Sequence, residues 1–212
     1  MPDYQIKCWD ANSFDFSSVP YVEQAIKARK WAFAADYVRL YALYTEGGIY
    51  LDTDVEVFRS LDDFLKYSFF SGTDVLHLNP YTIAGIESAI MGAEKGSICI
   101  HECMKYYENR NFIKSDGSFD LTIIPSVMSD IFKEYGYKKS DEVQFLHDNI
   151  AIFSTEYFTN TNSSTLRNRN YAHHYNTNAW LFSHRGRFFF FCRKYKLMKI
   201  YYILEYIHKY IR

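Results

Sequence analysis

Asp52 and Asp54, two aspartates one residue apart, are the side chains of this sequence best suited to hold a metal ion. They directly follow the hydrophobic run 49–51, and paired carboxylates are ligands that hard divalent cations prefer. A cation held by two carboxylates keeps open coordination positions, which substrate phosphates can fill. The pattern therefore predicts a site for Mn²⁺ or Mg²⁺ that neutralises the charge building up on a departing diphosphate.

Asp36 and Arg39 form a second pair upstream, in an Ala-rich stretch without Gly or Pro. Three-residue spacing places both side chains on one face of a helix. There Asp36 can bind a ribose hydroxyl and Arg39 a phosphate. Each feature alone is common, because Asp-x-Asp occurs in turns and Asp–Arg pairs are often surface ion pairs. Their combination, joined through Gly47 and Gly48, favours a functional site over packing.

Two elements must position these four residues. The sequence predicts one helix over 20–46, ended by a pair of glycines, and then a β-type run over 49–58. Alternation along that strand would send Asp52 and Asp54 to the same side, so that two carboxylates project together from a strand end.

Helix and strand patterns alternate along the rest of the chain without internal repeats, which predicts an α/β fold. Cys99 and Cys103 are expected to be reduced and buried on one helix face. The expected elements are strands at 4–9, 69–70, 89–91 and 151–153 (the last at a sheet edge), helices at 61–66, 98–109 and 121–135, and a polar loop over 160–178.

The length of 212 residues predicts one domain, residues 1–184, followed by a basic aromatic tail, residues 185–212. The formal net charge of -1 excludes the uniformly basic surface of a dedicated nucleic-acid-binding protein. The tail has eight basic residues against one acidic residue. Its apolar residues have helical spacing and predict an amphipathic C-terminal helix: Leu197, Ile200, Leu204, Ile207 and Ile211.

The sequence contains neither a signal-peptide pattern nor an apolar run of the roughly 20 residues needed to span a bilayer, which predicts a cytoplasmic protein. Two interpretations of the tail are open. Its apolar seam packs against the domain or a second copy in a homo-oligomer, or its basic and aromatic surface binds the anionic inner face of the cytoplasmic membrane.

The segment 32–58, AFAADYVRLYALYTEGGIYLDTDVEVF, closely resembles the signature of DXD-containing sugar transferases of capsular-polysaccharide synthesis. These are relatives of the α-1,6-mannosyltransferases and clostridial toxin glucosyltransferases. Segments 89–96 and 106–112, and His173-His174-Tyr175 with Trp180, resemble later landmarks of the same family in the same order. The resemblance implies a GT-A-like fold, a Rossmann-like sheet flanked by helices, that binds a nucleotide sugar and a divalent metal.

The resemblance assigns donor-binding roles to five residues. Asp36 and Arg39 match a pair that grips the ribose and the sugar or phosphate groups, and Tyr50 matches an aromatic residue that lines the donor. Asp52 bridges to the ribose, and Trp180 donates to the diphosphate from a C-terminal loop. Three further residues lie in a segment where relatives contact the transferred sugar, and their roles stay open: Glu87, Ser88 and Lys95.

For the metal, the resemblance implies that Asp54 is the direct ligand and that Asp52 binds through metal-bound water. Together with Arg39 they form the catalytic group. His174 is a further candidate ligand, although paired histidines in an Asn-rich loop are often only solvated and neutral imidazole suits Zn²⁺ better than Mg²⁺.

The activity implied is retaining transfer of a sugar from a nucleotide sugar (UDP-sugar or GDP-mannose) to a cell-surface polysaccharide or a lipid-linked glycan. Relatives usually begin with a strand some 30 residues before the position of Pro2, so the resemblance implies a sheet that lacks this first strand. One alternative is a non-catalytic family member that acts as a binding or partner subunit. Another is a haloacid-dehalogenase-like phosphatase, whose Asp-x-Asp motif needs Thr or Val where this chain has Glu56.

Overall fold

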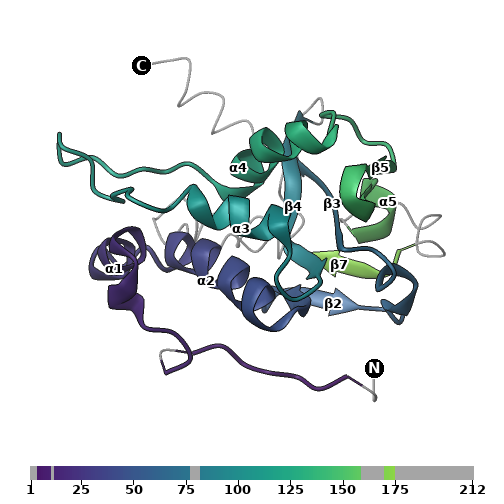
Figure 1. The fold of residues 1–212 in the computed structure, drawn as a ribbon, viewed down its shortest axis with the longest axis horizontal. Coiled ribbons are helices and arrows are strands. Elements are labelled where there is room, and N and C mark those ends of the chain that lie inside the picture. The colour runs from purple at the N-terminus through teal and green to yellow at the C-terminus, as the bar shows by residue number, and fades with distance from the viewer. Residues whose placement is uncertain (1–3, 11, 77–81, 159–169, 175–212) are drawn as a thin grey trace, which may run out of the picture. The chain divides into compact units, whose positions relative to one another are not determined.

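The computed structural model describes residues 4–10, 12–76, 82–158 and 170–174. All of them lie in the first of the two units into which the chain divides, Met1–Tyr175. Helices and strands both occur in this unit, in short runs of each, and helices flank a central mixed sheet (Figure 1). This mixed architecture agrees with the predicted α/β class. Trp180 and the predicted tail 185–212 lie outside the described residues, so the proposed boundary at 184 stays a prediction.

The α-helices of the described residues are α1 (Pro20–Lys27), α2 (Trp31–Glu46), α3 (Ile98–Lys105), α4 (Ile124–Ile131) and α5 (Thr155–Phe158). The strands are β1 (Gly48–Leu51), β2 (Val55–Val57), β3 (Phe69–Leu76), β4 (Thr82–Ala93), β5 (Gln144–Leu146), β6 (Ile150–Phe153) and β7 (Ala172–His174). Within these ranges, no helix combines the length and the apolar character needed to cross a bilayer.

Five strands form a central mixed sheet in the order β1-β4-β3-β6-β5. β3 and β6 are parallel, and the other neighbouring strands are antiparallel. β2 and β7 form a separate antiparallel pair. The prediction that 151–153 is an edge strand is wrong, because β6 lies between β3 and β5 and is buried along its whole length. A short continuous apolar run is typical of such a fully buried strand.

The two faces of the central sheet carry different apolar clusters. Phe69 faces the cluster that includes α1 to α4, and its neighbour Phe70 faces a smaller cluster with α5 and β7. The same alternation separates Met91 from Ile90 on β4, because successive strand side chains point to opposite faces. Figure 1 shows α2 and α3 side by side. Cys99 and Cys103 are buried in the larger cluster, as predicted.

The predicted helix over 20–46 is two helices, α1 and α2, and this prediction is wrong at residues 28–30. Arg29 has a left-handed backbone conformation, with φ of 56°, which is uncommon for a non-glycine residue. The backbone N–H of Lys30 donates to the carbonyl of Ala25 at 2.8 Å and closes the end of α1. No Gly or Pro marks this break in the sequence, and for this reason the sequence pattern predicted one continuous helix.

The predicted strand at 4–9 is also wrong. This segment is not part of any strand in the described residues, and Ile6 is 92% exposed. Trp9 packs edge-on against Tyr41 of α2, with ring centroids 5.9 Å apart. A strand needs a neighbouring strand to pair its backbone groups, and residue alternation alone does not supply one.

A bulge in β4 is the main irregularity of the central sheet. The four residues 87–90 of β4 lie opposite only Gly72 of β3. The Ser71 hydroxyl donates to the backbone carbonyls of Glu87 and Ile90 and so holds the two ends of the bulge together. Bulges redirect side chains and are frequent beside active sites. The bulge therefore marks residues 87–90 as neighbours of a candidate functional site.

Helix α4 lies so close to β4 at Gly85 that a side chain there would collide with it. A Cβ at Gly85 would be 2.1 Å from the Pro125 carbonyl oxygen and 2.4 Å from Ser129 Oγ. We expect Gly85→Ala to lower the free energy of unfolding by about 1–3 kcal/mol, measured by urea denaturation. Ser115→Ala, in an exposed loop, is the control and should change it by less than about 0.5 kcal/mol. Equal stability of Gly85→Ala and wild type would contradict this packing.

Candidate functional site

Asp52 and Asp54 lie in the turn between β1 and β2, not on one continuous strand as predicted. The chain leaves the central sheet here and enters the β2–β7 pair. The backbone N–H of Asp52 donates to the Ala89 carbonyl on β4 at 2.8 Å, and the N–H of Val55 donates to the Asp52 carbonyl at 3.1 Å. Turn closure, rather than strand alternation, therefore brings the two carboxylates together.

Strand β7 brings His174 to this turn, because His174 pairs with Val55 in the β2–β7 ladder. The ring Nε2 of His174 is 3.5 Å from Asp54 Oδ1. One ligand atom from each of Asp52, Asp54 and His174 lies within 4.8 Å of the others. Two carboxylates and an imidazole form a donor set that Mn²⁺ accepts, since it combines hard oxygen ligands with one nitrogen.

The neighbouring histidine, His173, lies on the same strand but is not part of this cluster. It pairs with Glu56 in the ladder, and its ring centroid lies 6.4 Å from that of Phe58. The prediction of a loop over 160–178 is therefore wrong at 172–174, which form β7. Strand pairing separates the two adjacent histidines and brings His174, the candidate ligand that the resemblance implied, to the aspartates.

Arg39 is the buried cation at the centre of the site, with 6% of its surface exposed. Its Nη2 lies 3.2 Å from Asp36 Oδ1, and its Nη1 lies 3.3 Å from Asp52 Oδ1. Nη1 also donates to the Ser88 carbonyl at 2.9 Å. The guanidinium carbon lies 4.9 Å from the centre of the Tyr50 ring. Arg39 therefore connects α2, the aspartate turn and the β4 bulge.

The charges of this group depend on one another. Burial raises the pKa of Asp36 to about 7, although the nearby Arg39 opposes the shift. Burial lowers the pKa of Arg39, but Tyr50, Asp52 and Asp36 outweigh this effect and keep the guanidinium charged. The Tyr50 hydroxyl donates to Asp52 Oδ1 at 2.6 Å and orients that carboxylate. Four of the predicted donor residues thus lie together, and the fifth, Trp180, lies outside the described residues.

Glu87, to which the sequence assigned no role, is a buried member of the site with 2% of its surface exposed. Its Oε2 is 3.1 Å from Nδ1 of His174, and its Oε1 accepts the Ala89 N–H at 2.7 Å. The available signal was an isolated acidic residue within the apolar run 83–93. A carboxylate buried in such a run must be paired, because an unpaired buried charge is very costly.

The contacts of His174 make it strongly basic in the metal-free protein. Burial lowers the pKa of His174, but the hydrogen bond to Glu87 and the charges of Glu87, Asp54 and Asp52 raise it to about 9. Burial raises the pKa of Glu87, but His174 and two backbone N–H groups outweigh this effect and lower it. Burial and the charge of Glu87 raise the pKa of Asp74 on β3 above its usual range.

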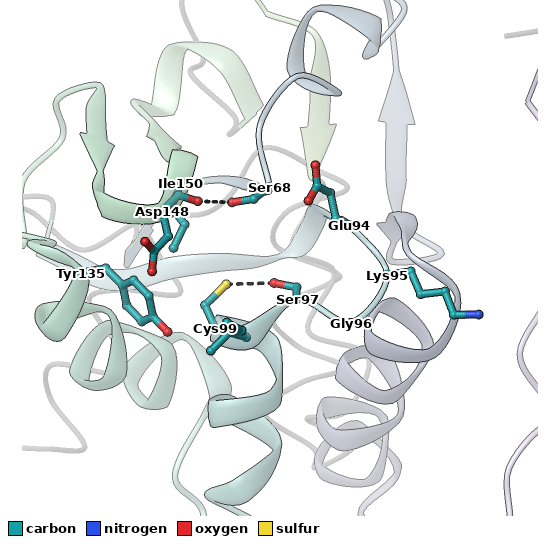
Figure 2. Close-up of a pocket in the computed structure, with 10 residues that line it drawn as sticks. Ser68, Glu94, Lys95, Gly96, Ser97, Cys99, Tyr135, Asp148 and Ile150 are labelled. Atoms are coloured by element: carbon teal, nitrogen blue, oxygen red, sulfur yellow. Dashed lines mark hydrogen bonds between the residues drawn. The ribbon is translucent and has the colours of Figure 1, made fainter.

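A cavity of about 260 Å³ lies elsewhere, at the end of the sheet where β4 ends and β3 and β6 begin (Figure 2). Asp52 follows the opposite end of β1, whose first residue pairs with the last residue of β4. Ser97 and Cys99 of the cavity contact each other, with Oγ and Sγ 3.2 Å apart. Lys95 lines this cavity with its side chain directed away from it, so it does not lie with Glu87 and Ser88.

Two comparisons with known proteins agree on the class of this site. Residues 1–70 match the family model described as a glycosyltransferase sugar-binding region containing a DXD motif. A 99-residue segment is 34% identical to inositol phosphoceramide mannosyltransferase 3 of Schizosaccharomyces pombe and covers 45% of this chain. The segment spans 26% of that relative's length. Both findings support a DXD-containing glycosyltransferase.

The raised pKa of His174 predicts that the metal-free protein loses stability at alkaline pH. Because the folded-state pKa, about 9, lies above the usual value of 6.5, this stabilisation is full below pH 6.5 and is lost as the pH rises through 9. With EDTA present, we expect the free energy of unfolding of wild type to fall over this range by on the order of 2 kcal/mol more than that of His174→Gln.

The matched control is His147→Gln, a substitution of an exposed histidine outside the site. In this variant the free energy of unfolding, measured by urea denaturation, should fall with rising pH as it does in wild type. Parallel curves for wild type and His174→Gln would contradict the ion-pair environment of His174.

Proposed function

We propose that this protein is a metal-dependent glycosyltransferase that moves a sugar from a nucleotide-sugar donor to a glycan or lipid-linked acceptor. The observation that carries the proposal is the convergence of Asp52, Asp54 and His174 beside the buried Arg39. The DXD family match over residues 1–70, which contains both aspartates and Arg39, supports it.

The fold is consistent with a GT-A-like assignment, since a central mixed sheet is flanked by helices and the aspartate turn lies at the end of a sheet strand. Within this proposal the donor is a UDP-sugar or GDP-mannose, and transfer retains the anomeric configuration. The S. pombe relative is named as a mannosyltransferase, which supports including GDP-mannose among the donors to be tested.

The proposed roles follow from the contacts of each residue. Asp52, Asp54 and His174 hold Mn²⁺ or Mg²⁺, which when bound acts as a Lewis acid toward the leaving nucleoside diphosphate. Arg39 provides a fixed positive charge that offsets the repulsion between the carboxylates and phosphate oxygens. Tyr50 and Arg39 hold the carboxylate of Asp52 in place without the metal, so that little reorganisation is needed when the donor binds.

Two alternatives predict different results. A non-catalytic partner subunit would keep the fold, but it would neither hydrolyse a nucleotide-sugar donor nor transfer its sugar. A phosphatase of the haloacid-dehalogenase type would form a covalent aspartyl-phosphate at the Asp-x-Asp motif. The position at which that motif needs Thr or Val holds Glu56, which is exposed on β2. The comparisons also favour the glycosyltransferase.

Thermal unfolding with UDP- and GDP-sugars, each with and without Mn²⁺, tests the proposal. We expect one donor to stabilise the protein only when Mn²⁺ is present, by about 2.7 kcal/mol at 100 times its dissociation constant. Asp54→Asn should abolish this stabilisation and donor hydrolysis, while Asp130→Asn, at an exposed ion pair with Lys133, should not. If no donor stabilises wild type in the presence of Mn²⁺, the enzyme proposal is wrong.

We further propose that the acceptor is carried on a lipid and that residues 185–212 attach the protein to the inner face of the cytoplasmic membrane. The eight basic residues of this segment and the ceramide in the name of the S. pombe relative support this. Liposomes containing anionic lipid should bind the full chain, and removal of residues 185–212 should weaken binding at least tenfold, since each Lys or Arg near such a surface contributes about 1 kcal/mol. Unchanged co-sedimentation after the removal would contradict membrane attachment by this segment.

A further inference from the structure

We propose that Glu87 is a positioning residue of the metal site, which fixes the imidazole of His174 so that Nε2 is directed to an ion shared with Asp52 and Asp54. The inference rests on the metal site of the proposed function and deepens it. Glu87 acts through the His174 ring, so its effect on the ion is indirect.

The two ring nitrogens of His174 face two different carboxylates. Nδ1 lies 3.1 Å from Glu87 Oε2, and Nε2 lies 3.5 Å from Asp54 Oδ1. A metal-ligating imidazole binds through one nitrogen and donates the N–H of the other, usually to a carboxylate or a carbonyl. The arrangement therefore assigns Nδ1 as the donor to Glu87 and leaves the Nε2 lone pair for the ion.

Glu87 is itself held at both carboxylate oxygens. Oε2 meets His174, and Oε1 accepts the backbone N–H of Ala89 at 2.7 Å. The backbone at Glu87 is also fixed, because the Ser71 hydroxyl donates to its carbonyl oxygen. A carboxylate with 2% exposure and these contacts cannot turn toward solvent, which makes it a rigid acceptor for the imidazole.

The same part of β4 also positions the aspartate turn. Ala89 donates its N–H to Glu87, and its carbonyl accepts the N–H of Asp52 at 2.8 Å. Ala89 therefore connects Glu87, which contacts His174, with the backbone of Asp52. This connection relates Asp52, in the turn that follows β1 of the central sheet, to His174 on β7 of the two-stranded pair.

Mn²⁺ affinity, measured by calorimetry on the full chain, tests the inference through a double-mutant cycle. Gln has the size of Glu, but its amide nitrogen cannot accept, so Glu87→Gln loses the bond from either Ala89 or His174. We expect Glu87→Gln to weaken Mn²⁺ binding by about 10- to 100-fold. In a His174→Ala background the same substitution should have no further effect, because Glu87 acts through that ring.

Glu102→Gln is the matched control. Glu102 also accepts a side-chain hydrogen bond, from the Tyr135 hydroxyl at 2.9 Å, but lies on α3. Its substitution should leave Mn²⁺ affinity unchanged. Equal weakening by Glu87→Gln with and without His174 would overturn the inference, since it would show a general effect on the fold. Unchanged Mn²⁺ affinity in Glu87→Gln would also overturn it.

A second measurement does not require a variant to fold. In wild type saturated with Mg²⁺ and labelled with ¹⁵N-histidine, NMR should find the His174 proton on Nδ1 and none on Nε2. A proton on Nε2 would overturn the inference while leaving metal binding by the aspartates intact. A wild-type protein that binds neither Mn²⁺ nor Mg²⁺ would instead contradict the metal site of the proposed function, and the inference with it.

Discussion

The buried guanidinium of Arg39 is the interaction on which the candidate site depends. A charge with 6% exposure is stable only when anionic and carbonyl groups surround it, and Arg39 finds them on three separate parts of the chain. Asp36 belongs to its own helix, Asp52 to the turn after β1, and Ser88 to the bulge of β4. Satisfying one buried charge therefore fixes the relative positions of α2, the turn and the bulge.

The bulge in β4 provides the second constraint. In a regular ladder, the residues of β4 would pair with β3 one for one and their backbone groups would be used within the sheet. The extra residues at 87–90 instead direct Ser88 to Arg39 and Glu87 to His174. Ala89 then pairs with the backbone of Asp52. A local irregularity thus links Arg39 of α2 to the cluster of Asp52, Asp54 and His174.

Much of the candidate site could be predicted from local sequence. Asp36 and Arg39 share a helix face as their spacing indicated, and Asp52 and Asp54 follow a strand with their carboxylates together. The fold was harder to predict at places where the pairing of backbone groups decides which element forms. The helix break at Arg29 has no Gly or Pro to mark it, the segment with Ile6 alternates but pairs with no strand of the described residues, and the polar loop contains β7.

The sequence by itself determined the residue types, the presence of both helices and strands, and the short-range pairs, because these depend on contacts a few residues apart. The family resemblance already pointed to His174, but only the tertiary structure decided how strand register brings this histidine to the aspartates and that Glu87 supports it. His174 and Glu87 are 87 residues apart, and they meet through the pairing of β7 with β2 and the β4 bulge. No local pattern encodes such a meeting, because it depends on strand register and on the need to pair every buried charge.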